Sequence, residues 1–212
     1  HRREVEYLRR GASGQPVFWS GAEAFVEAEK QALLAPRLRR ELAGLTSWDA
    51  VAPIHERFRA TAWSQSALDW MTTADLSLRL PELLLMRVDK MAMGTSLEGR
   101  VPFLDHHMVE LALSIPEPMR TSGGELKHLL KKAVRGVIPD ELIDRPKQGF
   151  GVPVADWVLD RLGGHAREEL DAFTRATDLL DRDTVLSVVE QRRGPDTWYL
   201  LNLALWWQEY IP

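Results

Sequence analysis

One lysine lies in a loop that is closely bordered by proline and glycine, Arg145-Pro146-Lys147-Gln148-Gly149-Phe150-Gly151-Val152-Pro153. A lysine ammonium is a compact positive charge that can reach phosphate oxygens and stabilise negative charge as it develops in a reaction. A single loop lysine is usually only a solvated surface charge, but the prolines and glycines that closely border this one favour a functional role. Lys147 is therefore a candidate catalytic residue.

A second set of charges interrupts an apolar helical segment, Leu80-Pro81-Glu82-Leu83-Leu84-Leu85-Met86-Arg87-Val88-Asp89-Lys90-Met91. By the 3.6-residue repeat, Arg87 and Lys90 lie on about one face of the helix, and Asp89 points elsewhere. Buried charges are costly unless they are paired. These residues therefore either form structural ion pairs or line the edge of a substrate pocket, and both interpretations stay open.

A third charged stretch is Ser96-Leu97-Glu98-Gly99-Arg100-Val101-Pro102-Phe103-Leu104-Asp105. Its glycine and proline predict a fixed turn, because glycine relaxes the backbone and the residue before a proline favours an extended conformation. Glu98 and Arg100 are placed to orient one another or nearby backbone groups, and Asp105 is expected to cap a helix. We favour a scaffolding role for this stretch.

Three other patterns have plainer explanations. Ser122-Gly123-Gly124 resembles the start of a phosphate-binding loop, but no apolar strand precedes it, so we expect a turn before a helix. His106 and His107 point in different directions on a helix, and no further ligand spacing completes a metal site. A solvated helix face, rather than a nucleic-acid patch, is expected for the cations Lys127, Lys131, Lys132 and Arg135.

The elements that position these residues are predicted to be almost entirely helical, because apolar residues recur at spacings of three and four and strand alternation is nearly absent. Ser47 is expected to cap the first clear helix, and the next one should end near Pro81. The segment 82–93 is apolar on nearly its whole circumference, which predicts burial on most sides. Further helices are expected after Asp105 as far as Pro116, over 125–137, and over 154–162, 165–175, 182–192 and 196–210.

Composition limits the classes of function. The 212 residues are 45% hydrophobic and 27% charged, with a formal net charge of -4, which argues against a protein that coats nucleic acid. The chain has no cysteine, so a thiol nucleophile, a disulfide and a thiolate metal site are excluded. No apolar run approaches the roughly 20 residues that span a bilayer. Because the chain opens without an initiator Met or a signal-peptide pattern, we expect a piece of a longer protein.

Taken in order, the three charged stretches resemble motifs in the C-terminal half of the synthetase domain of glutamine-hydrolysing asparagine synthetases and related amidotransferases, the asparagine synthase family. The resemblance runs from about Trp63 to Trp157. It implies a mostly α fold, namely the helical C-terminal portion of an adenine nucleotide α-hydrolase-like (PP-loop ATP pyrophosphatase) α/β synthetase domain whose sheet is largely missing. Residues 1–212 would then all belong to this portion.

The resemblance also implies a reaction: ATP adenylates a carboxylate, pyrophosphate leaves, and ammonia attacks the acyl-adenylate to form an amide. Lys147 matches the family's catalytic loop lysine, and Arg87 matches a basic position near the substrate. Motif positions that shape the site are matched by Asp89, Lys90, Glu98, Arg100 and Gly149. The implied cofactors are ATP and Mg²⁺, and the implied location is the cytoplasm. The expected partners are the missing N-terminal part of the protein, a small carboxylate, ammonia from glutamine and a second copy in a homodimer, with no nucleic acid and no membrane.

The chain also departs from the family pattern. It lacks the family's Ser-Gly-Gly-x-Asp-Ser loop, its acidic Gly-Asp-Glu motif and the glutaminase cysteine, so the chain alone is predicted to be inactive. Leu83 and Leu84 are apolar where many asparagine synthetases have an acidic residue. This difference leaves two alternatives open: an amide ligase for another carboxylate, such as a natural product or a cell-surface sugar, and a helical interaction module without catalysis.

Overall fold

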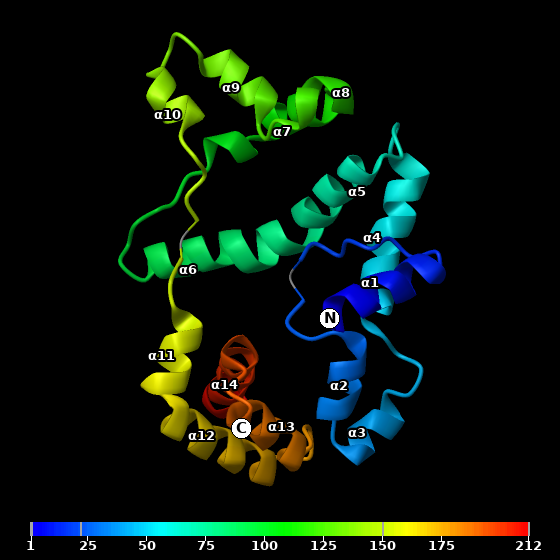
Figure 1. Cartoon of the computed structure of the whole chain (residues 1–212), viewed down its shortest axis with the longest axis vertical. Helices are drawn as coiled ribbons and strands as arrows, with labels where there is room; N and C mark the ends of the chain where they lie inside the picture. The colour runs from blue at the N-terminus through cyan, green and yellow to red at the C-terminus, as the bar shows by residue number, and fades with distance from the viewer. Residues whose placement is uncertain (1, 22, 150, 212) are drawn as a thin grey trace. The chain divides into compact units, whose positions relative to one another are not determined.

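The computed structural model describes residues 2–21, 23–149 and 151–211, except for the side chain of Ala155 (Figure 1). Helices dominate, and the extended pairing in these residues consists of two isolated bridges, Leu34 with Leu180 and Arg135 with Ile138. The mostly α fold predicted from the periodicity is confirmed. The chain divides into two compact units: residues 1–53 together with 151–212, and residues 54–150.

The first unit is formed by helices from both ends of the chain. Four of them, from the C-terminal part, have the order predicted, with ends shifted by only a few residues. Its elements are α1 (Arg2–Ala12), α2 (Glu27–Leu33), α3 (Pro36–Glu41), the first half of α4 (Ser47–Thr61), α11 (Val154–Asp160), α12 (Gly163–Ala176), α13 (Arg182–Glu190) and α14 (Gly194–Tyr210).

The core of this unit lies where α12, α13 and α14 meet, and α2 adds one leucine to it. The buried residues that form it are Leu33, Leu170, Phe173, Val185, Val188, Leu200 and Ala204. Two backbone hydrogen bonds join the N-terminal segment to the C-terminal one: the Ala35 N–H donates to the Leu179 carbonyl at 2.9 Å, and the Asp181 N–H donates to the Leu33 carbonyl at 2.8 Å. The two ends of the sequence therefore fold as one body.

The N-terminus of α4 differs from the prediction that Ser47 caps it. The helix begins at Ser47 itself, and the residue before it takes the capping position. Asp49 accepts hydrogen bonds from the backbone N–H of Thr46 at 2.6 Å and from its hydroxyl at 2.9 Å. Thr46 donates both bonds, so the arrangement matches only the half of a capping box in which an acidic side chain three residues on accepts from the capping residue's N–H. The Ser47 N–H instead donates to the carboxylate of Glu27 at 3.1 Å, which ties α4 to α2.

The second unit holds the first two charged stretches and the beginning of the third, whose last three residues belong to the first unit. It contains the second half of α4, followed by α5 (Ala67–Ala74), the π-helix η1 (Asp75–Leu85), α6 (Met86–Met93), the 3-10 turn η2 (Pro102–Leu104), α7 (His106–Ser114), α8 (Glu117–Arg120), the 3-10 turn η3 (Ser122–Gly124), α9 (His128–Val134) and α10 (Asp140–Asp144).

The predicted boundary near Pro81 is wrong, because α5, η1 and α6 follow one another as one helical rod (Figure 1). A proline ring clashes with the carbonyl four residues earlier in an α-helix. Here Pro81 lies inside a π-helix, whose hydrogen bonds span five residues and whose wider turn relieves that clash. The Met86 N–H donates to the Pro81 carbonyl in this register. The helix therefore changes from α-helical to π-helical hydrogen bonding around Pro81 and does not end there.

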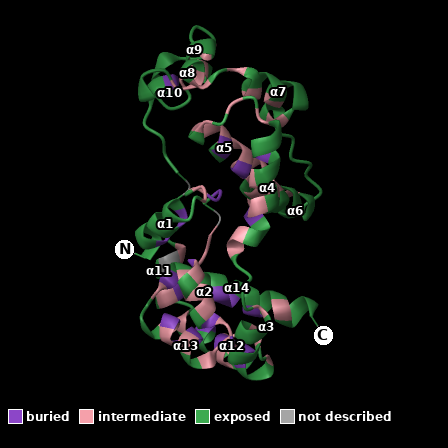
Figure 2. Ribbon diagram, turned by 90° about the vertical axis from the view of Figure 1, so that its right-hand side faces the viewer, coloured by how far each residue is buried: buried purple, intermediate pink, exposed green. Residues whose placement is uncertain are grey.

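The prediction that the segment 82–93 is buried on most sides is also wrong for this chain. Met86, Val88, Met91 and Met93 are exposed on α6. Figure 2 colours the ribbon of the chain by burial. An apolar helix is buried only where another surface packs on it, and the described residues of the second unit leave these side chains uncovered.

Two smaller expectations in the second unit are confirmed and one is corrected. Asp105 caps α7 by accepting a hydrogen bond from the His107 N–H at 3.0 Å. The segment Ser122–Gly124 forms a turn before a helix, with both glycines at positive φ. The helix expected from residue 125 begins only at His128, because Lys127 takes a left-handed conformation with φ 59°. Left-handed backbone cannot continue a right-handed helix.

Candidate functional site

The helix α6 presents two of the candidate cations. Arg87 and Lys90 lie in its regular α-helical part, so their separation of three residues keeps them close to one face. Both side chains are exposed, and within the described residues neither has a hydrogen-bond or ion-pair partner. The alternative of structural ion pairs thus finds no partner in this part of the chain, and contact with a substrate stays a prediction. Asp89, on another face of α6, is likewise exposed.

The end of α6 fixes the start of the next charged stretch. Ser96 takes a left-handed conformation with φ 59°, and the Leu97 N–H donates to the Ala92 carbonyl at 3.0 Å. This is the pattern of a Schellman motif, in which a left-handed residue closes the last turn of a helix. The chain is thereby turned back along α6.

Gly99 brings the turned-back chain close to α6. A Cβ built on Gly99 would lie 3.2 Å from Cγ1 of Val88, which is tighter than most real contacts. The first two charged stretches therefore meet at this point. On either side of the glycine, Glu98 accepts a hydrogen bond from Arg100 at 3.2 Å, and both side chains are exposed. The expectation that these two residues orient one another agrees with this contact.

The third stretch is the loop between α10 and α11. Lys147 is exposed there, and in the described part of the chain its ammonium has no hydrogen-bond or ion-pair partner. A Cβ built on Gly149 would meet open space, so steric crowding does not explain this glycine. Phe150 of the same motif lies outside the described residues. Hydrogen bonds and ion pairs join the described part of this loop to neither of the other two stretches, so its place in one site remains a prediction.

The second unit also contains a partly buried ion pair that the sequence did not predict. Arg120 pairs with Asp69 across 51 residues, and both side chains are largely buried. Asp69 also accepts a hydrogen bond from the Ser66 hydroxyl at 2.9 Å, and Ser66 caps α5. The pattern Ser66-x-x-Asp69 is a capping signal that the sequence contains. Arg120 carries no such signal.

The Asp69 carboxylate borders a cavity of about 180 Å³, which Trp63, Thr73 and Leu113 also line. Burial alone would raise the pKa of this carboxyl, but hydrogen bonds from Ser64, Arg120 and Ser66 and the positive charge of Arg120 outweigh burial and lower the pKa. The carboxyl is therefore ionised near neutral pH. Since its oxygens already have partners, the pair fixes α8 against α5 rather than offering a free base.

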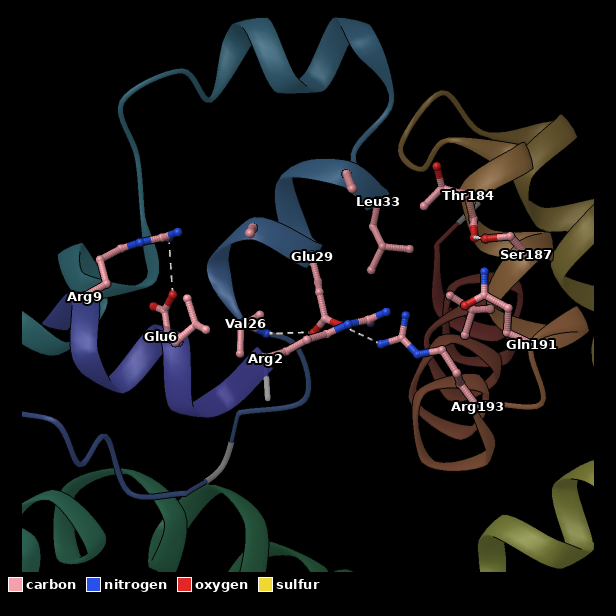
Figure 3. Close-up of a pocket in the computed structure, with 14 residues that line it drawn as sticks. Arg2, Glu6, Arg9, Val26, Glu29, Leu33, Thr184, Ser187, Gln191 and Arg193 are labelled. Carbon is pink, nitrogen blue, oxygen red and sulfur yellow. Dashed lines mark hydrogen bonds and ion pairs between the residues drawn. The ribbon is translucent and has the colours of Figure 1, made fainter.

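The first unit contains a larger cavity of about 510 Å³ between α1, α2 and α13 (Figure 3). Glu29 lies on its wall between Arg2 and Arg193, and it pairs with both. Burial would raise the pKa of Glu29, but hydrogen bonds from Arg2 and the Val26 N–H, with the charge of Arg193, lower the pKa. The charged groups on this wall are thus paired with one another, which is typical of a structural junction.

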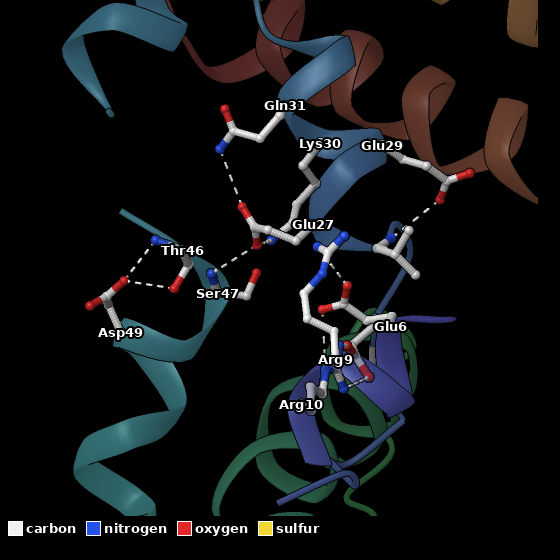
Figure 4. A network of polar contacts seen from close by, with 12 residues as sticks. Glu6, Arg9, Arg10, Glu27, Glu29, Lys30, Gln31, Thr46, Ser47 and Asp49 are labelled. Atoms are coloured by element: carbon white, nitrogen blue, oxygen red, sulfur yellow. Dashed lines mark hydrogen bonds and ion pairs between the residues drawn. The ribbon is translucent and has the colours of Figure 1, made fainter. Parts of the chain in front are cut away.

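A second charged cluster holds α1 in place. The Arg10 guanidinium is buried and lies 3.5 Å from the Trp19 ring centroid. It donates to Glu6 at 3.3 Å (Figure 4), and it also pairs with Glu23. The spacing of Glu6 and Arg10 predicts a helical ion pair, but nothing in the sequence predicts that the pair is buried.

The implied cofactors fit the described residues only in part. An exposed lysine ammonium such as that of Lys147 suits a phosphate oxygen. Among the residues that the structure describes, however, there is no group of three or more His, Cys, Asp or Glu that could hold a metal ion. Residues for Mg²⁺ are therefore not found there, and we derive no step through the metal. The described helices also include none that is long and apolar enough to cross a membrane.

Comparison with known proteins identifies the family. The family model described as asparagine synthase matches residues 5–208, which include all three charged stretches. The chain is 30% identical over 149 residues to the glutamine-hydrolyzing asparagine synthetase 1 of Bacillus subtilis (strain 168), over 68% of this chain and 23% of that protein. It is 27% identical over 215 residues to a putative glutamine-hydrolyzing asparagine synthetase of Mycobacterium tuberculosis (strain ATCC 25618 / H37Rv), over 94% of this chain and 32% of that protein.

One further relative has a higher identity over a shorter segment. The human glutamine-hydrolyzing asparagine synthetase is 41% identical over 68 residues, which are 31% of this chain and 12% of that protein. No solved structure matches the chain. The chain spans about a quarter to a third of the length of the first two relatives, and the family model covers nearly all of it. The chain therefore belongs to the asparagine synthase family.

Proposed function

We propose that this chain supplies the helical C-terminal part of an ATP-dependent ligase that forms an amide. The ligase adenylates a carboxylate, releases pyrophosphate and lets ammonia attack the acyl-adenylate. The observation that carries this proposal is the match of the asparagine synthase family model to residues 5–208. The relatives' names support the same chemistry, because they describe glutamine-hydrolyzing asparagine synthetases.

In this proposal, Lys147 is the catalytic residue of the chain. Its ammonium contacts a phosphate oxygen of ATP and stabilises the negative charge that develops as pyrophosphate leaves. Arg87 contacts the carboxylate substrate from α6. The surrounding positions, Asp89, Lys90, Glu98, Arg100 and Gly149, shape the site. The absence of a partner for Arg87 and Lys147 within the described residues agrees with these roles, since a substrate group can then pair with each cation.

The substrate need not be aspartate. Leu83 and Leu84 are apolar, and Leu84 is exposed in η1, about one turn before Arg87. An apolar side chain beside the cation favours a carboxylate with an apolar neighbour over a second negative charge. Aspartate and a larger or less polar carboxylate are therefore the two substrate classes to compare. Ammonia would come from glutamine in a glutaminase part outside this chain, and a cytoplasmic location remains a prediction.

ATP–pyrophosphate exchange tests the proposal. The polypeptide to assay is the complete product of the reading frame that encodes this chain, with aspartate and then a panel of other carboxylates. Lys147→Ala should lower exchange by about 10²- to 10³-fold, the usual effect of removing one group that stabilises developing charge. Lys132→Ala is the matched control, because Lys132 is also an exposed lysine of the second unit.

The results separate the three candidate functions. Exchange that depends on aspartate supports an asparagine synthetase, whereas exchange with another carboxylate supports the related amide ligase. If no carboxylate promotes exchange, or if Lys147→Ala behaves like Lys132→Ala, the ligase assignment is wrong and a non-catalytic helical module remains. The 212-residue chain alone should show no exchange.

A further inference from the structure

The cavity of about 510 Å³ lies within the first unit, because all of its lining residues belong there. Small-molecule pockets usually enclose about 300–1,000 Å³, with mostly apolar walls and a few polar groups that orient the ligand. Most of the lining here comes from α1, α2 and α13. Its apolar part consists of Val5, Val26, Ala28, Ala32, Leu33 and Val188. Both the size and the apolar wall are therefore those of a ligand site.

One exposed arginine of the lining, Arg2, shares its carboxylate with a second arginine. Glu29 pairs with Arg2 and also with Arg193, the latter at 2.6 Å (Figure 3). The Arg2 side chain is 58% exposed, whereas that of Arg193 is 23% exposed and is held by Asp196 as well. Arg2 can therefore turn toward another anion while Glu29 keeps a cation.

A second exposed arginine of the lining, Arg9, has the same arrangement. It pairs with Glu6 at 3.3 Å, and Glu6 also pairs with the buried Arg10 at 3.3 Å. Arg2 and Arg9 lie seven residues apart on α1, so they share one face of the helix and are separated by about 10 Å along its axis. Because Val5 lies between them on that face, α1 contributes an apolar side chain flanked by two cations.

We propose that this cavity binds a small monocarboxylate with an apolar body. The body would lie against the apolar wall, and the carboxylate would pair with Arg2 or Arg9. A guanidinium matches a carboxylate through two parallel hydrogen bonds, which favours this head group over a neutral one. The two glutamates of the lining disfavour a second negative charge on the ligand. The inference does not rest on the proposed function, because Lys147 and Arg87 belong to the second unit.

Isothermal titration calorimetry with octanoate tests the proposal. Acetate has the same head group without the apolar body, and 1-octanol has the apolar body without the charge. Octanoate should bind at one site per chain with a Kd of about 1 mM or below, and both matched probes should bind at least about fivefold more weakly. The titrations are made with the 212-residue chain and with the complete product of the reading frame that encodes it.

A variant that fills the cavity shows whether octanoate binds there. Ala28→Trp places a large side chain in the lining without touching an ion pair, and Ala172→Trp is the control at an exposed alanine of α12. Octanoate affinity should fall at least about tenfold in Ala28→Trp and stay unchanged in Ala172→Trp. Circular dichroism melting of both variants checks that they are folded.

A second set of variants tests the cations. Arg2→Gln and Arg9→Gln each remove one exposed guanidinium, and Arg175→Gln is the matched control away from the cavity. Arg175 is 66% exposed and pairs with Asp171, which also keeps a second arginine, Arg182. At least one of the two cavity variants should weaken octanoate about three- to tenfold and leave 1-octanol unchanged, while the control changes neither.

Several results would overturn the proposal. Absence of octanoate binding would remove the site altogether, and equal affinities for octanoate and 1-octanol would remove the anionic head group. If Ala28→Trp binds octanoate as its control does, the ligand lies elsewhere. If neither cavity arginine matters, the assigned cations are wrong. Binding to the 212-residue chain that is lost in the complete product would show that the rest of the polypeptide fills the cavity. The titrations need no ATP, so their outcome is separate from that of the exchange assay.

Discussion

Replacing Arg10 by methionine should destabilise the first unit far more than replacing an exposed arginine. The Arg10 side chain is only 2% exposed. Its guanidinium pairs with Glu6 and Glu23 and also donates a hydrogen bond to the Val17 carbonyl. Methionine keeps most of the apolar stem but removes the charge. Glu23 is then left without its cation, and the buried Glu6 keeps only its pair with the exposed Arg9, at 3.3 Å.

The expected magnitude follows from that uncompensated charge. Removing one partner of a buried ion pair costs about 3–5 kcal/mol. Loss of the contact between the guanidinium and the Trp19 ring, at 3.5 Å, adds to the same variant and is worth about 0.5–2 kcal/mol. Glu23 is partly exposed and recovers some hydration, and Glu6 keeps its pair with Arg9, so we expect about 3–5 kcal/mol in total.

The matched control is Arg192→Met. Arg192 pairs with Asp160 at 2.7 Å, but both side chains are 65% exposed. Exposed pairs contribute about 0–1 kcal/mol, so this variant should lose no more than that. Urea unfolding followed by tryptophan fluorescence measures the difference, because Trp19 lies beside Trp48, with ring centroids 5.6 Å apart and the rings tilted by 31°, and reports on this region.

A third variant separates the charge from the packing. Glu6→Gln and Glu23→Gln added to Arg10→Met remove the uncompensated carboxylates and should recover most of the lost stability. Were Arg10→Met to lose less than about 1 kcal/mol, as its exposed control does, the cluster would not be a buried ionic anchor. Failure of the triple variant to recover would instead assign the loss to packing on Trp19.

Two further predictions concern other parts of the chain. Hydrogen bonds from Lys131 and His128 lower the pKa of Glu125 from 4.5 to about 2, so its ionised form contributes stability above about pH 4.5 that is lost as the pH falls toward 2. Carboxyl NMR titration should find this low pKa, and Glu125→Gln should weaken the acid dependence of unfolding in that window; an ordinary pKa near 4.5 would contradict the hydrogen bonds. Leu170→Ala, at a fully buried core position, should cost about 2–5 kcal/mol in urea unfolding, whereas Leu8→Ala at an exposed position should cost little. Similar losses for the two variants would place Leu170 outside the core.

The helices of the C-terminal segment could be predicted because each shows its own periodic pattern. Leu170, Phe173, Val185 and Val188 recur at helical spacing and form the buried face that the spacing requires. Pro81 misled the prediction for a local reason. A proline usually marks a helix boundary, but here a change to π-helical hydrogen bonding lets the helix continue. No residue type in the sequence predicts that change.

Contacts between distant residues could not be read from the sequence. Glu29 and Arg193 are 164 residues apart, and Asp69 and Arg120 are 51 apart. Each partner taken singly is an ordinary charged residue of a helix or a turn, and only the folded chain brings the two together. The three charged stretches were found because residue type and order carry the family pattern, which needs no knowledge of contacts.

The exposed positions of the candidate residues bear on where catalysis would occur. A cation in bulk water interacts weakly with a developing charge, because water screens it, whereas the same cation in a dry, fixed site is far more effective. Lys147 and Arg87 are both exposed in this chain. In the proposed ligase, both cations would become more effective once water is removed from around them. The exposure of Lys147 and Arg87 is therefore a physical reason to expect that the 212-residue chain alone lacks activity even with its motif residues intact.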